Sequence, residues 1–280
     1  MTRHVTRKLP SQLAEHVQAF LAGDRQPVAP KGAATVVLLR PANEGLEVYL
    51  LRRHGGMAFA AGMYAFPGGT VDSRDFDKAV AWAGPTPQEW GHRLACEASE
   101  ARALVCAAVR ETFEESGVLL AGPSPGSIVR DTTGADWESD RAALVDRSLG
   151  FADFLQRRRL VVRGDLLRAW AHWVTPEFEP RRYDTRFFLA ALPAGQVTRD
   201  VSGEADRVTW MSPMEATAAV DDSRMAMLPP TYITLSELAG YSGPEQAFAA
   251  AETRKTITVT PGVEVVDGEA FLTLDEGVTP

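Results

Sequence analysis

The sequence predicts an α+β protein in which helices flank a mixed β-sheet. Segments with the spacing of strands and segments with the spacing of helices mix along the 280-residue chain, without the regular alternation of parallel α/β folds. Apolar residues make up 45% and charged residues 24% of the chain, which is typical of a globular protein. A chain of this length buries roughly three quarters of its unfolded surface, so it needs no disulfide or metal ion to fold.

The N-terminal part of the chain contains one predicted helix and three predicted strands. Residues 11–21 carry apolar side chains at helical spacing and begin with a serine. Residues 34–40 and 47–52 are apolar runs joined by a turn that contains Asn43, which predicts two paired strands. Residues 63–67 form a third, shorter apolar run. We therefore expect a helix, a strand pair and a short strand, in that order.

The longest helix is predicted over 97–116, because this segment has no glycine or proline and Gly117 follows it as a C-terminal cap. Residues 73–91 carry charges, prolines and glycines, so we interpret them as an insertion. Cys96 and Cys106 would lie about 15 Å apart along this helix. A disulfide needs Cα atoms within about 7 Å, so we expect two free thiols in a reducing compartment.

The C-terminal half contains further strands and helices between loops. A glycine- and proline-rich loop is predicted first, and a β-hairpin around Asp267-Gly268 is predicted last. The predicted elements are a loop over 121–136, a helix over 140–158, strands over 166–174, 186–192 and 207–211, a helix opening at Ser212-Pro213, a helix over 233–239, and the hairpin strands 257–265 and 271–274.

These elements predict one main domain with additions at both ends. Residues 1–31 form an N-terminal helical extension, and residues 32–220 form the main domain. The main domain carries an insertion at about 73–96 and a helical insertion at about 121–160. Residues 221–280 form a C-terminal extension of a helix and a β-hairpin that packs on the same domain.

Net charge and the lack of long apolar runs argue against a nucleic-acid-binding, membrane-spanning or secreted protein. The 29 basic and 37 acidic residues give a net charge of −8, so nonspecific binding to nucleic acid is not expected. No window approaches 18 uninterrupted apolar residues, so no membrane span is expected. No apolar run follows the basic N-terminus, and the chain ends in Val278-Thr279-Pro280 instead of a peroxisomal Ser-Lys-Leu signal. With the free thiols, this predicts a cytoplasmic protein.

Three carboxylates cluster near the end of the long predicted helix. At about 100° per residue, Glu115 lies about 40° to one side of Glu111 and Glu114 about 60° to the other. Like charges at this spacing repel each other, and the helix dipole is unfavourable to anions near its C-terminal end. Arg110 can pair with Glu114 four residues on, but no cation of this helix is expected to face Glu111 or Glu115. A hard divalent cation would relieve the repulsion.

A solvated acidic face is the commoner explanation for such a cluster. An earlier segment makes a metal site a stronger alternative to a solvated face. Phe66-Pro67-Gly68-Gly69 places a glycine turn at the end of a predicted strand. Glycine lets the backbone approach a ligand closely. A strand, a glycine turn and an acidic helix together favour a metal and phosphate site.

The residues from Arg110 to Val118 resemble the second half of the Nudix box. That pattern reads Gly, five residues, Glu, seven residues, and then Arg-Glu-apolar-x-Glu-Glu-x-Gly-apolar. The positions that match are Arg110, Glu111, Glu114, Glu115, Gly117 and Val118. Gly69-Thr70-Val71-Asp72 resembles the first half, but it lies some forty residues before Arg110 instead of the usual fourteen. The box is therefore split by about 25 to 30 residues, with Asp72 or Asp75 in place of the first Glu.

The chain further resembles the Nudix branch that includes peroxisomal coenzyme A diphosphatases, from roughly residue 33 to residue 216. A signature directed at coenzyme A is matched in part, with His54 in place of a serine and Tyr64 in place of a valine. The matching segments are Leu50-Leu51, Arg53, residues 62–69, residues 173–176, residues 181–185 and Phe187-Phe188-Leu189.

The resemblance implies a Nudix fold and a diphosphatase that depends on Mg²⁺ or Mn²⁺. Glu111, Glu114 and Glu115 are then the metal ligands, and Arg110 orients a carboxylate. Glu204 is the candidate for a further acidic ligand or base, with an exposed loop residue as its alternative. Arg53, Gly68, Gly69, Arg181 and Arg182 are the candidates for substrate binding, with a surface turn as the alternative for the three arginines.

The substrate implied by the resemblance is a small diphosphate, with coenzyme A or acyl-coenzyme A first and NADH or ADP-ribose as alternatives. A Nudix-like domain that senses a nucleotide without cleaving it is the alternative from another class. Relatives are often homodimers, so a homodimer is expected.

Overall fold

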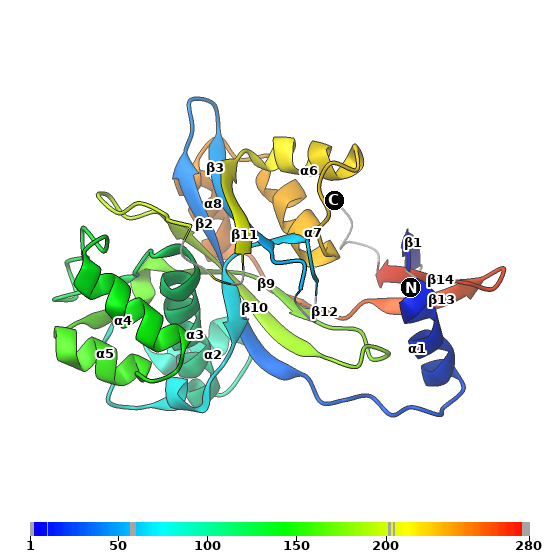
Figure 1. Ribbon diagram of the computed structural model, residues 1–280, viewed down its shortest axis with the longest axis horizontal. Coiled ribbons are helices and arrows are strands. Elements are labelled where there is room, and N and C mark those ends of the chain that lie inside the picture. Colours follow the sequence, from blue (N-terminus) through cyan, green and yellow to red (C-terminus); the bar gives the residue numbers. More distant parts are fainter. Residues whose placement is uncertain (1–2, 10, 57–59, 201–202, 204, 276–280) are drawn as a thin grey trace.

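The computed structural model describes residues 3–9, 11–56, 60–200, 203 and 205–275 (Figure 1). Eight strands within these ranges form a mixed central sheet. They are β2 (Lys31–Pro41), β3 (Leu46–Arg53), β4 (Tyr64–Ala65), β5 (Gly68–Thr70), β9 (Arg168–Val174), β10 (Tyr183–Ala191), β11 (Ala205–Met211) and β12 (Thr258–Val259). The order is β11-β3-β2-β10-β9-β12, with β4 beside β3 and β5 beside β2.

The neighbours of β2 show how the sheet opens near its centre. β2 runs parallel to β10 and antiparallel to β3. β3 pairs with β2 only from Leu39 to Pro41, whereas β5 pairs with β2 from Ala33 to Thr35. β3 and β5 therefore pair with the same edge of β2, one at each end of it. The glycine turn of β5 occupies the part of this edge that β3 does not pair with.

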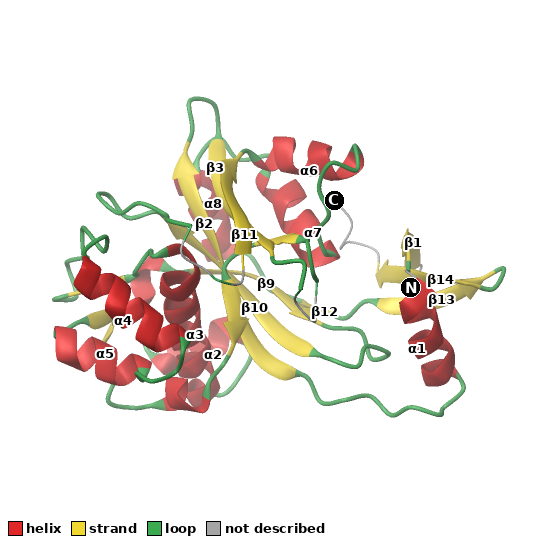
Figure 2. Cartoon of the chain, viewed as in Figure 1, coloured by secondary structure: helices red, strands yellow, loops and turns green. Residues whose placement is uncertain are grey.

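Helices cover both faces of this sheet (Figure 2). Along β2, Val36 and Leu38 belong to one apolar core, and Val37 and Leu39 belong to the opposite one, as expected of a strand buried on both faces. Helices of the first core are α2 (Pro87–Leu94), α3 (Ala98–Ser116), α4 (Ala135–Val145) and α5 (Phe151–Arg158); those of the second are α6 (Pro213–Asp221), α7 (Pro229–Leu238) and α8 (Pro244–Thr253). The predicted mixed sheet between helices is confirmed.

A second sheet joins the two ends of the chain. It contains β1 (Arg3–Lys8), β14 (Glu269–Asp275) and β13 (Gly262–Val266), in the order β1-β14-β13. Helix α1 (Ser11–Leu21) packs on it through Val17, which shares a core with Leu272 and with Phe178 from the loop between β9 and β10. This loop therefore connects the terminal sheet to the central one.

The insertion contains more structure than the sequence predicted. It holds a 3₁₀ turn η1 (Ser73–Phe76), β6 (Trp82–Ala83) and α2. β6 belongs to a third sheet with β8 (Val161–Arg163) and β7 (Ala121–Gly122), in the order β6-β8-β7, and a 3₁₀ turn η2 (Gly164–Leu166) follows β8. β8 thus pairs with one strand from each inserted region.

Several predicted elements differ from the structure. The helix predicted over 140–158 is two helices, α4 and α5, because Arg147 adopts a left-handed backbone (φ 64) and Gly150 caps α5. The strand predicted over 257–265 is also divided, since β12 joins the central sheet and only β13 pairs with β14. The turn at Asp267-Gly268 is confirmed. α7 begins at Pro229, as proline fits the first turn of a helix, and α8 was not predicted.

Two further observations bear on the expectations from the sequence. Cys96 precedes α3 instead of lying in it, and both cysteines are free. In the part of the chain that the structure describes, no helix combines the length and apolarity needed to cross a membrane.

Candidate active site

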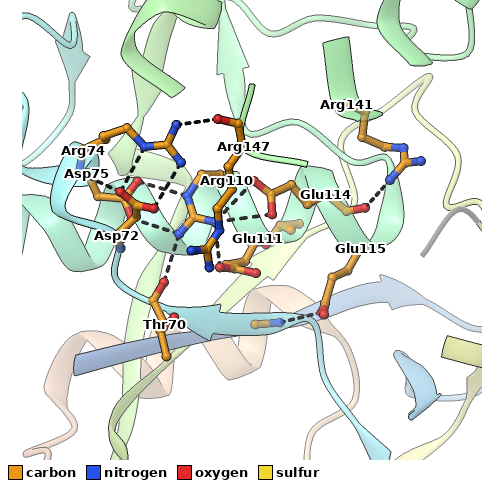
Figure 3. Close-up of polar contacts among 12 residues, drawn as sticks. Thr70, Asp72, Arg74, Asp75, Arg110, Glu111, Glu114, Glu115, Arg141 and Arg147 are labelled. Atoms are coloured by element: carbon orange, nitrogen blue, oxygen red, sulfur yellow. Dashed lines mark hydrogen bonds and ion pairs between the residues drawn. The ribbon is translucent and has the colours of Figure 1, made fainter. Parts of the chain in front are cut away.

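A polar cavity of about 370 Å³ lies where the end of α3 meets β5, and the three glutamates of α3 all line it. Glu111, Glu114 and Glu115 face it together with Gly68 and Gly69. The acidic helix and the glycine turn, which are separated by some forty residues of sequence, therefore meet in space (Figure 3).

Backbone contacts join the glycine turn directly to two of these carboxylates. The N–H of Gly68 donates a hydrogen bond to Oε2 of Glu115 over 2.8 Å, and Glu115 is only 7% exposed. A Cβ atom added to Gly69 would lie 2.5 Å from the carboxyl carbon of Glu111. A side chain at this position would displace the Glu111 carboxylate, whereas a Cβ at Gly68 would lie 2.5 Å from the backbone oxygen of Ala34, so the turn requires glycine at Gly68.

Arg110 holds the two halves of the site together. Its Nε and Nη2 donate to the two carboxylate oxygens of Asp75 over 3.0 and 2.9 Å, and Nη2 also donates to the carbonyl of Thr70 over 3.0 Å. Asp75 is 1% exposed, so this is a buried two-point ion pair. Its carboxylate also accepts the N–H of Asp72 in a capping box that shapes η1.

This pair shows how the split Nudix pattern closes. Five residues separate Gly69 from Asp75, as in the unsplit pattern, whereas 34 residues separate Asp75 from Arg110 instead of seven. Of the two acids considered for the first Glu position, Asp75 is therefore the one that has both the spacing and the contact with Arg110. Asp72 instead caps η1 and binds Arg74 over 3.0 Å.

One expectation about this helix was wrong. Arg110 contacts Glu111 as well as Glu114, with Nη1 lying 2.7 Å from Oε1 of Glu111 and 3.3 Å from both carboxylate oxygens of Glu114. The helical spacing placed Arg110 away from Glu111, but its long side chain bends back because Asp75 anchors the other guanidinium nitrogens. The repulsion among the carboxylates is therefore partly relieved by this arginine.

Burial and neighbouring charges shift the pKa values of the ionisable groups in this site. Burial raises the pKa of Glu111 to about 7, and Glu114 adds to this while Arg110 opposes it. Burial also raises the pKa of Glu114. Burial alone would lower the pKa of Arg110, but its ion pairs outweigh burial and raise it. The raised pKa of Glu111 indicates that one arginine does not fully compensate these buried charges.

The rim of the cavity contains residues that the sequence did not indicate. Arg74 and Arg147 line it, and Nη1 of Arg74 donates to the carbonyl of Arg147 over 3.2 Å. Arg141 of α4 donates to the carbonyl of Glu114 over 2.7 Å and so ties α4 to the acidic end of α3. No local pattern pointed to these arginines, because their role depends on how α4 and α5 fold back over α3.

The remaining predicted residues divide between this cavity and other places. Arg53 lines the cavity. Arg181 is exposed, and Arg182 is buried with its guanidinium donating to the carbonyls of Thr175 and Val28, so the structure does not bring this pair to the cavity. Glu204 lies outside the described residues, although the adjacent Gly203 lines the cavity.

The oxygen donors of Glu111, Glu114 and Glu115 fit a hard divalent cation chemically. As their side chains stand, however, the described ranges contain no group of three histidine, cysteine or acidic residues that could hold a metal ion. Arg110 occupies the space between the first two carboxylates. A cation bound there would have to take over contacts that Arg110 now makes.

The charge of the cavity favours such a cation. Within the described residues, the lining contains five carboxylates and four guanidinium groups, so it carries no net positive charge for a phosphate. The carboxylates are Asp72, Asp75, Glu111, Glu114 and Glu115, and the guanidinium groups belong to Arg53, Arg74, Arg110 and Arg147. A diphosphate entering it would need added positive charge, which a divalent cation supplies.

Comparisons with known proteins show what the chain is similar to. The family model described as the NUDT19 Nudix domain matches residues 92–238. Acyl-coenzyme A diphosphatase NUDT19 of Xenopus laevis is 27% identical over 229 residues, covering 70% of this chain and 60% of that protein. The human protein of the same name is 28% identical over 243 residues, covering 72% of this chain and 63% of that protein. The chain thus spans less than two thirds of the length of these relatives.

A solved structure supports the fold more directly. The crystal structure of a NUDIX hydrolase from Alicyclobacillus acidocaldarius is similar with a TM-score of 0.69 and 29% sequence identity. The similarity covers 79% of this chain and 96% of that chain.

Proposed function

Because the chain belongs to the NUDT19 Nudix domain family, we propose that it hydrolyses the diphosphate linkage of coenzyme A or an acyl-coenzyme A, with Mg²⁺ or Mn²⁺ as cofactor. The observation that carries this proposal is the meeting of Glu111, Glu114, Glu115 and the Gly68-Gly69 turn in one cavity. These are the oxygen donors and the close backbone approach that a metal and phosphate site needs.

The three glutamates would hold the cation, and when bound it would neutralise charge on the phosphoryl oxygens and activate a water molecule. Arg110 is a positioning residue, because its ion pair with Asp75 holds the glycine turn against α3. Arg53 lines the cavity and offers a planar fork of donors to a phosphate.

The reaction consumes one water molecule. Its oxygen forms a bond to one phosphorus while the bond from that phosphorus to the bridging oxygen breaks, which leaves two phosphate monoesters. The water proton passes to a carboxylate. Glu204, the residue after Gly203, remains our candidate for this acceptor from the sequence, and Glu111, Glu114 and Glu115 are the alternatives within the cavity.

The substrate follows from the relatives, which are named acyl-coenzyme A diphosphatases. NADH and ADP-ribose remain the alternatives because they carry the same linkage. We propose to incubate the protein with coenzyme A, octanoyl-coenzyme A, NADH and ADP-ribose separately, with magnesium or manganese, and to identify products by mass spectrometry. Two monoesters whose masses together equal coenzyme A plus water are expected. Cleavage of NADH or ADP-ribose alone would contradict the proposed substrate.

A substitution tests the assignment of the carboxylates. Glu115→Gln keeps an oxygen that can accept the Gly68 N–H but removes the negative charge, so the fold is expected to persist. We expect the turnover number to fall by about 10² to 10⁴. Glu100→Gln, in the first turn of the same helix, is the matched control and should retain activity. Full activity in Glu115→Gln would exclude Glu115 from the reaction.

A further inference from the structure

A second cavity, of about 540 Å³, adjoins the acidic one and differs from it in chemistry. Its walls include Trp173, Phe178 and Phe187 of the β9–β10 region, Phe66 before β5, Leu13 of α1 and Leu272 of β14. Within the described residues, the only charged side chains that line it belong to Arg53 and Glu179. We call this cavity the apolar chamber.

The chamber and the acidic cavity are continuous. Five residues line both of them: Thr35, Arg53, Gly68, Tyr183 and Thr185. Gly68 is also the residue whose N–H binds Glu115. A molecule whose diphosphate lies beside the glutamates can therefore extend one arm past Gly68 and Arg53 into the chamber.

The chemistry of the walls selects which arm enters. The nucleoside arm of coenzyme A carries a further phosphate, and burying that charge without partners would be costly. A purine base needs several polar partners, whereas most residues that line the chamber are apolar, and the hydroxyl of Thr175 already accepts the N–H of Tyr183 over 3.0 Å. A hydrocarbon chain needs no polar partner and gains from burial.

Part of the chamber comes from outside the region that matches the family model. Leu13 belongs to α1 and Leu272 to β14, whereas the match covers residues 92–238. Leu272 shares a core with Phe178, so the terminal sheet is packed against the loop that lines the chamber. The far wall thus comes from the terminal elements of the chain.

We propose that the apolar chamber binds the hydrocarbon tail of an acyl-coenzyme A whose diphosphate lies in the acidic cavity, which makes the protein select decanoyl and similar tails over an acetyl group. The flexible arm between diphosphate and thioester passes Arg53 and Gly68, and the tail lies between Trp173, Phe178 and Leu13. This inference rests on the proposed function, because it assigns the direction in which that substrate lies.

The first test compares kcat/KM for coenzyme A, acetyl-coenzyme A, octanoyl-coenzyme A and decanoyl-coenzyme A. A fully buried methylene is worth about fourfold, so partial burial of the tail should raise kcat/KM by at least about tenfold from acetyl to decanoyl. Equal kcat/KM for all four would overturn the chamber assignment while leaving the diphosphatase intact. Failure to cleave any of them would instead overturn the proposed function.

A matched pair of variants on α1 locates the effect. Leu13→Asp places a charge in the chamber, whereas Leu21→Asp places the same charge on the same helix at a site that is 57% exposed. We expect Leu13→Asp to lower the ratio of kcat/KM for decanoyl-coenzyme A over coenzyme A by about tenfold, and Leu21→Asp to leave it unchanged. A loss of equal size for every substrate would mean that the chamber holds a part they all share, such as a base, and would overturn the assignment.

Binding without turnover gives a readout that does not depend on catalysis. In buffer with EDTA, calorimetry should show that decanoyl-coenzyme A binds more tightly than coenzyme A to the unaltered chain, and that Leu13→Asp removes the difference. Folding of the variants is checked by their thermal transitions. Equal affinity of both ligands for the unaltered chain would contradict the proposal even if the diphosphatase is active.

Discussion

The acidic cavity and the apolar chamber share an edge but are built in opposite ways. The acidic cavity brings five carboxylates and four guanidinium groups together, and its buried charges persist through pairing, as between Arg110 and Asp75. The apolar chamber has only two charged lining side chains among the described residues. The stability of a wall of paired charges depends on every partner being present, whereas the stability of an apolar wall depends mainly on the total volume of its side chains. Single substitutions should therefore affect the two cavities very differently.

The largest effect on stability is expected from the pair that holds the acidic cavity together. Asp75→Asn removes the charge that faces a buried guanidinium, and breaking such a pair costs about 3 to 5 kcal/mol. Urea unfolding of the metal-free protein measures this loss. Asp77→Asn, which is exposed two residues away, should change the free energy of unfolding by less than about 0.5 kcal/mol. An unchanged midpoint in Asp75→Asn would show that the pair does not hold the cavity together.

The next effect concerns geometry alone. Gly69→Ala adds a Cβ that would lie 2.5 Å from the Glu111 carboxyl carbon, so the turn or the carboxylate must shift. A displacement of this size near reacting groups lowers kcat by about 10²-fold. Gly126→Ala is the matched control, because a Cβ there meets nothing within 4 Å and its backbone φ is not in the left-handed region. Equal rates in both variants would mean that the close approach of Gly69 is not required.

The smallest effect is a change in Tm on adding manganese, which should depend on the acidic cavity and not on the apolar chamber. Manganese at about 100 times its dissociation constant should stabilise the protein by about 2.7 kcal/mol, which corresponds to a rise in Tm of about 5 to 10 °C. Glu114→Gln should reduce this rise, whereas Leu13→Asp should retain it because Leu13 lines only the apolar chamber. Differential scanning fluorimetry measures both. A loss of the manganese response in Leu13→Asp would show that the cavities are not separable.

The two cavities also differ in how far the sequence predicted them. The acidic cavity comes mainly from two short segments, 68–75 and 110–115, whose residue types indicate its chemistry directly. The three glutamates and Gly117 follow from helical spacing and capping, and the structure has the helix where it was expected. The apolar chamber draws on both ends of the chain and on four other regions, so no local pattern indicates it.

Particular residues show where sequence reasoning stopped. The contact between Arg110 and Asp75 crosses 34 residues, so the sequence left both Asp72 and Asp75 as candidates for the first Glu position. The break between α4 and α5 depends on a left-handed Arg147, a conformation that arginine rarely adopts and that composition does not reveal. Arg182 was predicted to bind phosphate, but its guanidinium donates to backbone carbonyls instead. Long side chains are bound by whichever acceptors the tertiary structure brings near them.

The position of Arg110 between the carboxylates has a consequence for the metal-free protein. A guanidinium with five donors can satisfy Asp75 and still reach Glu111 and Glu114, so it serves as a built-in counterion. The acidic end of α3 is therefore assembled before any cation arrives. In the proposed function, binding of the cation would be an exchange of partners within a preformed cavity, and this end of α3 would not have to refold when the ion leaves.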